Sequence, residues 1–159
     1  MTLGMTLETF TRLHVVISLI GIASGLMVVF GMMSGVRRDG WTTLFLWTTV
    51  LTSVTGFGFP VEHLLPSHKV GIISLIVLAV VFVARSRAHS GSWRWIYVIG
   101  SVLALYLNVF VLVVQLFQKV PTLAALAPTQ SELPFQLAQL AVFALFVWFA
   151  VAATKRFRF

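Results

Sequence analysis

The chain has 159 residues, and with 59% hydrophobic residues, 9% charged residues and a mean hydropathy of +1.01 its composition excludes an ordinary soluble domain. Its net charge is +7, but the basic residues adjoin apolar stretches instead of forming a basic arm, which argues against nucleic-acid binding. The absence of cysteine excludes disulfides, thiolate metal sites and cysteine nucleophiles.

Five long apolar stretches follow one another along the chain, each bounded by charged, proline or glycine residues. They cover residues 13–33, 41–59, 70–84, 93–117 and 133–154. A helix rises about 1.5 Å per residue, so about 20 residues cross a hydrocarbon layer of about 30 Å. Because helices satisfy their own backbone hydrogen bonds in lipid, we predict an all-α fold. Residues 1–159 would form a single polytopic membrane protein, a five-transmembrane-helix bundle.

The first two stretches carry different packing signals. Gly21 and Gly25 in the first are four residues apart, a spacing that lets a neighbouring helix approach closely. The second stretch is rich in hydroxyl groups, which can bond back to the preceding turn or across to a neighbour. These residues are Thr48, Thr49, Thr52, Ser53 and Thr55. Gly56 to Pro60 then ends this helix, because proline cannot continue it.

Two connections also stand out. Residues 60–68 contain two prolines and two histidines, and this loop can close over one end of the bundle. Residues 120–134 have an apolar middle bracketed by prolines, which predicts a short interfacial helix at residues 122–127. This helix would be either a tightly packed connection or a lid over the bundle.

The distribution of basic residues predicts the orientation of the bundle. With five spans, the C-terminal side receives Arg37, Arg38, Arg85, Arg87, Arg94, Lys155, Arg156 and Arg158. The N-terminal side receives only Arg12, Lys69 and Lys119. Positive charge in short segments marks the cytoplasmic side, so we predict the N-terminus outside and the C-terminus inside. The third stretch is the shortest, but omitting it would destroy this charge bias.

Polar residues recur at helical spacing in the half of the bundle nearest the N-terminus. Asn108, Gln115 and Lys119 share one face of the fourth stretch. Glu132, Gln136 and Gln139 share one face at the start of the fifth. His14 lies on the glycine face of the first stretch, which should point inward. Polar side chains in spans normally face the interior, so we predict that these residues converge on an outer-half pocket.

The resulting ligand-binding candidates are His14, His68, Asn108, Gln115, Lys119, Glu132, Gln136 and Gln139. Axial histidines at positions 14 and 68 would suit haem, whereas His or Gln donors beside an apolar channel would suit a quinone or another small molecule. His14, His63 and His68, with a carboxylate such as Glu62, would alternatively hold a metal ion. The simpler interpretation is that the amides join helices, that the histidines bond at the interface and that Lys119 snorkels to headgroups.

The sequence leaves the activity open. There is no phosphate-binding glycine loop and no His-Glu-x-x-His motif. The sole aspartate, Asp39, lies on the side opposite the clustered histidines, which argues against a Ser-His-Asp triad. Besides a binding protein, short soluble loops and small-residue helix faces fit a structural or accessory subunit of a larger membrane complex, or a homo-oligomer in the bilayer.

Two segments carry a resemblance to a known family. The stretch from Tyr106 to Pro121, continuing through Leu126-Ala-Pro-Thr-Gln-Ser-Glu132, resembles small bacterial inner-membrane proteins. Leu65-Pro-Ser-His68 fits the same pattern. The resemblance implies a multi-pass protein of the bacterial inner membrane and carries over no catalytic residue.

Overall fold

The computed structural model describes residues 4–59, 66–87 and 91–157, and nearly all of them are helical. Six helices follow in order: α1 (Leu7–Met33), α2 (Asp39–Gly56), α3 (Pro66–Arg87), α4 (Ser92–Lys119), α5 (Pro121–Leu126) and α6 (Leu133–Arg156). The all-α prediction is therefore confirmed. The short helix predicted in the last connection is present as α5, where Pro121 occupies the first turn and donates no backbone hydrogen bond.

Four of these helices are long and apolar enough to cross a bilayer. Within the described residues they are α1, the part of α3 from His68 to Arg87, α4 and α6. The helix α2 has 18 residues but is not among them. Its many threonines lower its hydropathy, although it forms the helix that the sequence predicts. Four helices are thus candidate spans by length and composition, and the fifth span stays a prediction.

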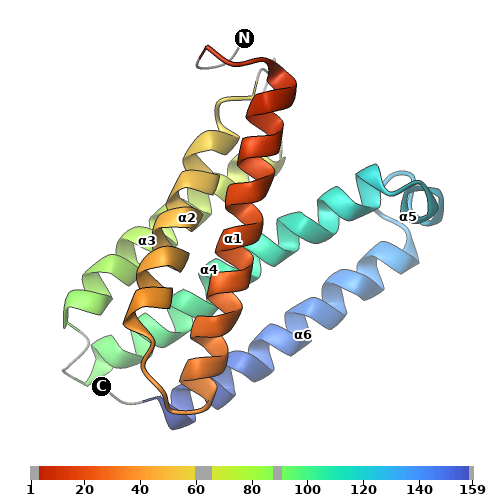
Figure 1. Cartoon of the computed structure of the whole chain (residues 1–159). Coiled ribbons are helices and arrows are strands. Elements are labelled where there is room, and N and C mark those ends of the chain that lie inside the picture. Colours follow the sequence, from red (N-terminus) through yellow and green to blue (C-terminus); the bar gives the residue numbers. More distant parts are fainter. Residues whose placement is uncertain (1–3, 60–65, 88–90, 158–159) are drawn as a thin grey trace.

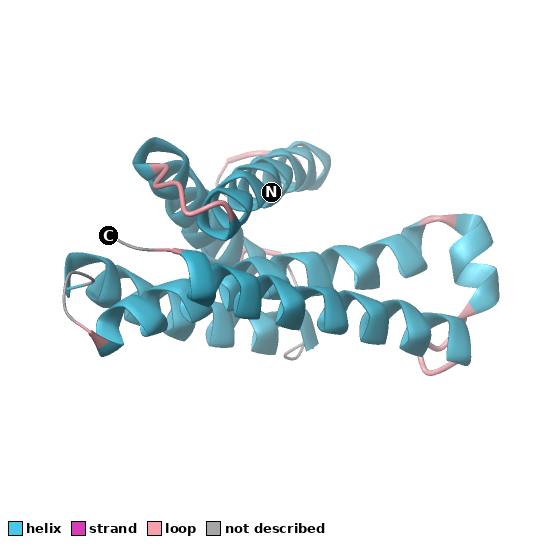
Figure 2. Ribbon diagram, turned by 90° about the horizontal axis from the view of Figure 1, so that it is seen from below, coloured by secondary structure: helices cyan, strands magenta, loops and turns pink. Residues whose placement is uncertain are grey.

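Four of the five long helices form two pairs that diverge toward one end, and α3 packs against α4 and α2. In Figure 1, α1 and α2 run side by side, as do α4 and α6, and the pairs separate toward the top of the view. Figure 2 shows the α1–α2 pair lying on one face of the other long helices. We call the end where α1 begins and α4 finishes the upper end, and the opposite end, which holds Met33, Asp39 and Arg156, the lower end. The buried core lies where the pairs cross, around Val29, Phe45, Leu46, Val98 and Leu105.

Gly25 makes this crossing possible. A Cβ atom added there would lie 2.7 Å from Leu105 Cδ1 of α4 and 2.8 Å from ring carbons of Phe45 of α2. Both neighbours are fully buried, so neither has free space to move into. Gly21, one turn earlier, faces Thr48 in the same way, with a would-be Cβ 3.2 Å from the threonine hydroxyl. The glycine pattern therefore packs helices within the chain, as close helix contacts in membranes require.

The hydroxyl groups of α2 are mostly satisfied by their own helix. Each donates to the carbonyl four residues earlier, at distances from 2.6 Å for Thr55 to 3.0 Å for Thr43. The others are Thr42, Thr48, Thr49, Thr52 and Ser53. Ser53 also reaches across to Ser74 of α3, at 3.2 Å. Both arrangements expected for these residues are thus present.

Arginines join the helix ends at the lower end. Arg94 of α4 donates to the carbonyls of Thr154 and Phe157, at 3.0 and 2.8 Å, so it caps the C-terminus of α6. Arg156 reaches the carbonyl of Met33 at the end of α1, at 3.5 Å. A cation at a helix C-terminus is favourable because the exposed carbonyls carry partial negative charge.

Candidate functional site

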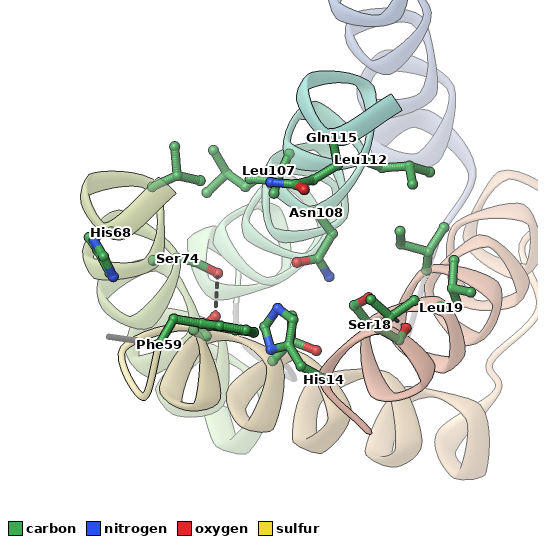
Figure 3. Close-up of a pocket in the computed structure, with 18 of the residues that line it drawn as sticks. His14, Ser18, Leu19, Phe59, His68, Ser74, Leu107, Asn108, Leu112 and Gln115 are labelled. Carbon is green, nitrogen blue, oxygen red and sulfur yellow. Dashed lines mark hydrogen bonds between the residues drawn. The ribbon is translucent and has the colours of Figure 1, made fainter. Parts of the chain in front are cut away.

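A cavity of about 460 Å³ lies between α1, α2, α3 and α4 in the upper half of the bundle. This volume is in the range of small-molecule sites. The walls are mostly apolar, with side chains such as Ile22, Leu107 and Leu112. A small set of polar residues from three helices lines this space: His14 and Ser18, His68 and Ser74, and Asn108 and Gln115. In Figure 3, His14, Asn108 and Gln115 lie around its middle and His68 lies at its edge.

The structure brings five of the eight predicted ligand-binding residues together. His14, His68, Asn108, Gln115 and Lys119 all line the cavity. The two polar faces that converge are therefore those of α1 and α4, and the first turns of α3 complete the wall.

His14 is held by α2. Its Nδ1 atom lies 2.8 Å from the hydroxyl of Thr55, and its ring meets the edge of the Phe59 ring at 5.2 Å between centroids. Gly56 borders the imidazole, and a Cβ there would make an ordinary contact with His14 Cε1 at 3.8 Å. The end of α2 thus fixes the position of a histidine on α1.

Asn108 joins α4 to α2 at the base of the cavity. Its side-chain amide donates to the hydroxyl of Thr49 at 3.2 Å. Thr49 is fully buried, and its own proton goes to the carbonyl of Phe45 at 2.7 Å, so its oxygen is available as an acceptor. Gln115, two turns further along α4, also lines the cavity, and its side chain makes no hydrogen bond within the described part of the chain.

His68 lies in the first turn of α3 and is buried. Its ring stacks on Phe57, with 5.5 Å between centroids and an interplanar angle of 26°. The Phe57 ring fits because Gly71, on the next turn of α3, has no side chain; a Cβ there would be 3.3 Å from the ring. Aromatic packing on Phe57 therefore helps to position His68.

The polar face at the start of α6 does not reach the cavity. Glu132 accepts hydrogen bonds from the backbone and hydroxyl of Thr129 and from the backbone of Ser131, at 2.7 to 3.3 Å. Gln136 donates to the carbonyl of Ser131, and Gln139 donates to the carbonyl of Phe110 on α4. The α6 residues therefore stabilise the turn before α6 and the α4–α6 contact. Helical periodicity predicts their shared face but not the neighbour that this face meets.

The Thr129–Glu132 turn has an electrostatic consequence outside the spans. The hydroxyl of Thr129, with the backbone N–H groups of Thr129 and Ser131, holds the pKa of the Glu132 carboxyl below its ordinary value. The carboxylate form is therefore the one that the turn favours.

Lys119 stands at the mouth of the cavity and is exposed. Among the described residues that line the cavity, none is acidic. In the predicted metal set, His63 and its partner Glu62 lie outside the described residues, as does most of the loop 60–68. Across residues 4–59, 66–87 and 91–157, no three histidine or carboxylate side chains are grouped closely enough to hold one ion.

Sequence reasoning missed the aromatic side of the cavity. Phe57 and Phe59 line it and contact the two histidines, and Phe10 packs on Phe59 at 5.0 Å between centroids. The signal was present in the alternation of glycine and phenylalanine at residues 56–59. Gly58 admits the Phe10 ring, since a Cβ there would lie 2.8 Å from Phe10 Cζ. The alternation of glycine and phenylalanine therefore marks an aromatic wall of the cavity as well as the end of α2.

The fold and the cavity define a multi-pass α-helical membrane protein with an internal small-molecule-sized site. Comparison of the chain with protein-family models, with curated proteins and with solved structures gives no significant match. The function is therefore argued from the geometry of the site.

Proposed function

We propose that the chain is a five-span protein of the bacterial inner membrane that binds a membrane-soluble small molecule in the upper cavity. A quinone-type head group is the leading ligand class. The observation that carries the proposal is the cavity itself, about 460 Å³ in volume, with apolar walls and a few polar groups gathered from α1, α3 and α4.

The contacts of α2 support its role as the fifth span. At the upper end Thr55 of α2 contacts His14 of α1, and at the lower end Arg38 packs against Gly31. Also at the lower end, Arg85 of α3 donates to the carbonyl of Asp39. The helix α2 thus lies along much of α1 and contacts α3, and both of these helices are candidate spans. Because its hydroxyls bond to its own carbonyls, its low hydropathy overstates the cost of placing it in lipid.

The charge distribution supports an orientation with the lower end in the cytoplasm. The arginines that cap helix ends lie there, and the upper end carries few basic residues. The cysteine-free chain offers a direct test by single cysteines and a membrane-impermeant thiol reagent. Thr129→Cys should react from outside and Ser34→Cys only after permeabilisation. Reaction of Ser34→Cys but not of Thr129→Cys in intact cells would contradict the orientation, and equal accessibility of the two cysteines would contradict the crossing of α2.

The rim of the cavity supports a ligand that arrives from the lipid. Leu19 of α1 and Leu116 of α4 line the cavity and are still 48% and 41% exposed. Their helices, α1 and α4, diverge toward the upper end in Figure 1. An apolar rim at this depth admits an acyl or prenyl chain, and His14, Asn108 and Gln115 offer hydrogen bonds to a head group.

Binding of a short-chain benzoquinone to the purified protein in nanodiscs tests the proposal. Leu112→Trp fills the cavity and should weaken binding at least about tenfold, since overpacking displaces the ligand. Leu140→Trp is the matched control because Leu140 is 62% exposed on α6, away from the cavity. Circular dichroism and size-exclusion chromatography establish that both variants fold. Equal affinities for the two variants would refute binding in this cavity.

Two competing functions give different readouts. Haem held by His14 and His68 would give the purified protein a Soret band that His14→Ala or His68→Ala removes, and a colourless protein from haem-replete cells would exclude it. An accessory subunit would co-purify with a partner after gentle extraction. Native mass spectrometry would then find a complex, whereas a monomer that binds quinone favours the proposed function.

A further inference from the structure

The hydrogen bonds around His14 fix which ring nitrogen carries the proton. The hydroxyl of Thr55 lies 2.6 Å from the carbonyl oxygen of Leu51, which is an acceptor only. Thr55 has one hydroxyl proton, and this bond uses it. The same oxygen lies 2.8 Å from His14 Nδ1, so it must accept a hydrogen bond there. In the neutral imidazole the proton is therefore on Nδ1.

The other ring nitrogen is consequently an acceptor. A neutral imidazole has one N–H, so Nε2 presents a lone pair. Within the described residues nothing bonds to this atom, and His14 lines the cavity. Figure 3 shows the ring directed toward Asn108 across the space. Thr55 of α2 thus makes Nε2 of His14 a hydrogen-bond acceptor, which the presence of a histidine alone does not determine.

We infer that the cavity selects the hydroxyl-bearing, reduced form of its ligand, a hydroquinone, whose O–H donates to His14 Nε2. The inference rests on the proposed function and deepens it. A quinone carbonyl at the same place would set its lone pairs against that of Nε2, with no proton between them. The hydroxyls of Ser18 and Thr52, which also line the cavity, donate to Val15 and Thr48 of their own helices, so neither competes for the place beside Nε2. The amide of Gln115 can donate or accept, so it serves the other end of either redox form.

The tautomer can be measured without any ligand. In protein with 15N-labelled histidine at about pH 8, above the ordinary histidine pKa of about 6.5, nitrogen chemical shifts distinguish protonated from bare ring nitrogens. His14 signals are those lost in His14→Gln. We expect a protonated Nδ1 and a bare Nε2, and Thr55→Val should release this constraint. A proton on Nε2 in the unsubstituted protein would overturn the inference, whatever the protein binds.

The binding test compares three probes that share one ring and one chain: a short-chain benzoquinone, its hydroquinone and the dimethyl ether of that hydroquinone, all under anaerobic conditions. One hydrogen bond gained should favour the hydroquinone by about tenfold over both others. Thr55→Val should bring the three affinities close together. Thr52→Val is the matched control, because Thr52 also lines the cavity and bonds to its own helix but does not touch His14. It should keep the preference.

The outcomes distinguish a failure of the inferred hydroquinone preference from a failure of the proposed function. Equal binding of quinone and hydroquinone, or a preference that survives Thr55→Val, overturns the inference and leaves the proposed function standing. Binding of none of the probes refutes the proposed function and the inference with it. The expected pattern, with the reduced form preferred and the preference lost only in Thr55→Val, supports both.

Discussion

Replacing Gly25 with alanine tests the close contact on which the helix crossing depends. The new methyl group would lie 2.7 Å from Leu105 Cδ1 and 2.8 Å from two ring carbons of Phe45, well inside van der Waals contact. Both side chains are fully buried, so the helices must separate. Overpacking of this kind typically costs about 1–3 kcal/mol, and the gain from replacing a helical glycine recovers up to about 1 kcal/mol. We expect Gly25→Ala to be less stable by about 1–2 kcal/mol.

Gly40→Ala is the matched control. Gly40 also lies in a helix, but nothing is within 4 Å of a Cβ added there. Without a clash only the backbone effect remains, so this variant should be equal to the parent or more stable by up to about 1 kcal/mol. Equilibrium unfolding in mixed micelles, followed by circular dichroism, gives both values. A Gly25→Ala protein as stable as Gly40→Ala would refute the packing argument, because the same substitution would then be insensitive to its surroundings.

Three further predictions concern the polar contacts. Asn108→Leu removes the bond to Thr49 and should lower the free energy of unfolding by about 0.6 kcal/mol, the average for such bonds between membrane helices; an unchanged value would mean that the bond does not form. Because the pKa of Glu132 is lowered in the folded chain, its stabilising effect is complete above the ordinary value of 4.5 and is lost as the pH falls through the lowered pKa. The chemical shift of the Thr129 amide should change with pH as Glu132 titrates, and this change should be absent in Glu132→Gln. Arg94→Ala should speed hydrogen exchange in the last turn of α6, and unchanged exchange would argue against the cap.

The helices could be predicted closely, because long apolar runs bounded by charges and prolines leave the backbone no other satisfied conformation in lipid. The ends moved by several residues where polar side chains continue a helix: α1 begins at Leu7 and α3 extends to Arg87. The helix α2 shows the limit of hydropathy. Hydropathy counts its hydroxyl groups as polar, but in the folded helix they donate hydrogen bonds to carbonyls of the same helix.

The candidate site, like the helices, could be predicted only in part. Periodicity correctly grouped Asn108, Gln115 and Lys119 on one face, and that face borders the cavity. The same reasoning grouped Glu132, Gln136 and Gln139, but these residues bond to the turn before α6 and to α4. The difference arises because α6 packs against α4 and the helix pairs diverge at the upper end (Figure 1). The cavity is lined by residues of α1, α2, α3 and α4, and by none of α6 within the described chain.

The sequence by itself therefore determined the solvent, the helices and the faces that carry polar groups, since these follow from composition and from a repeat of 3.6 residues. Only the tertiary structure decided which faces meet, because a helical repeat specifies a direction around one axis and says nothing of the neighbour in that direction. It also decided the chemistry of His14: the proton on its ring is placed by Thr55, a residue 41 positions away that α2 brings beside it.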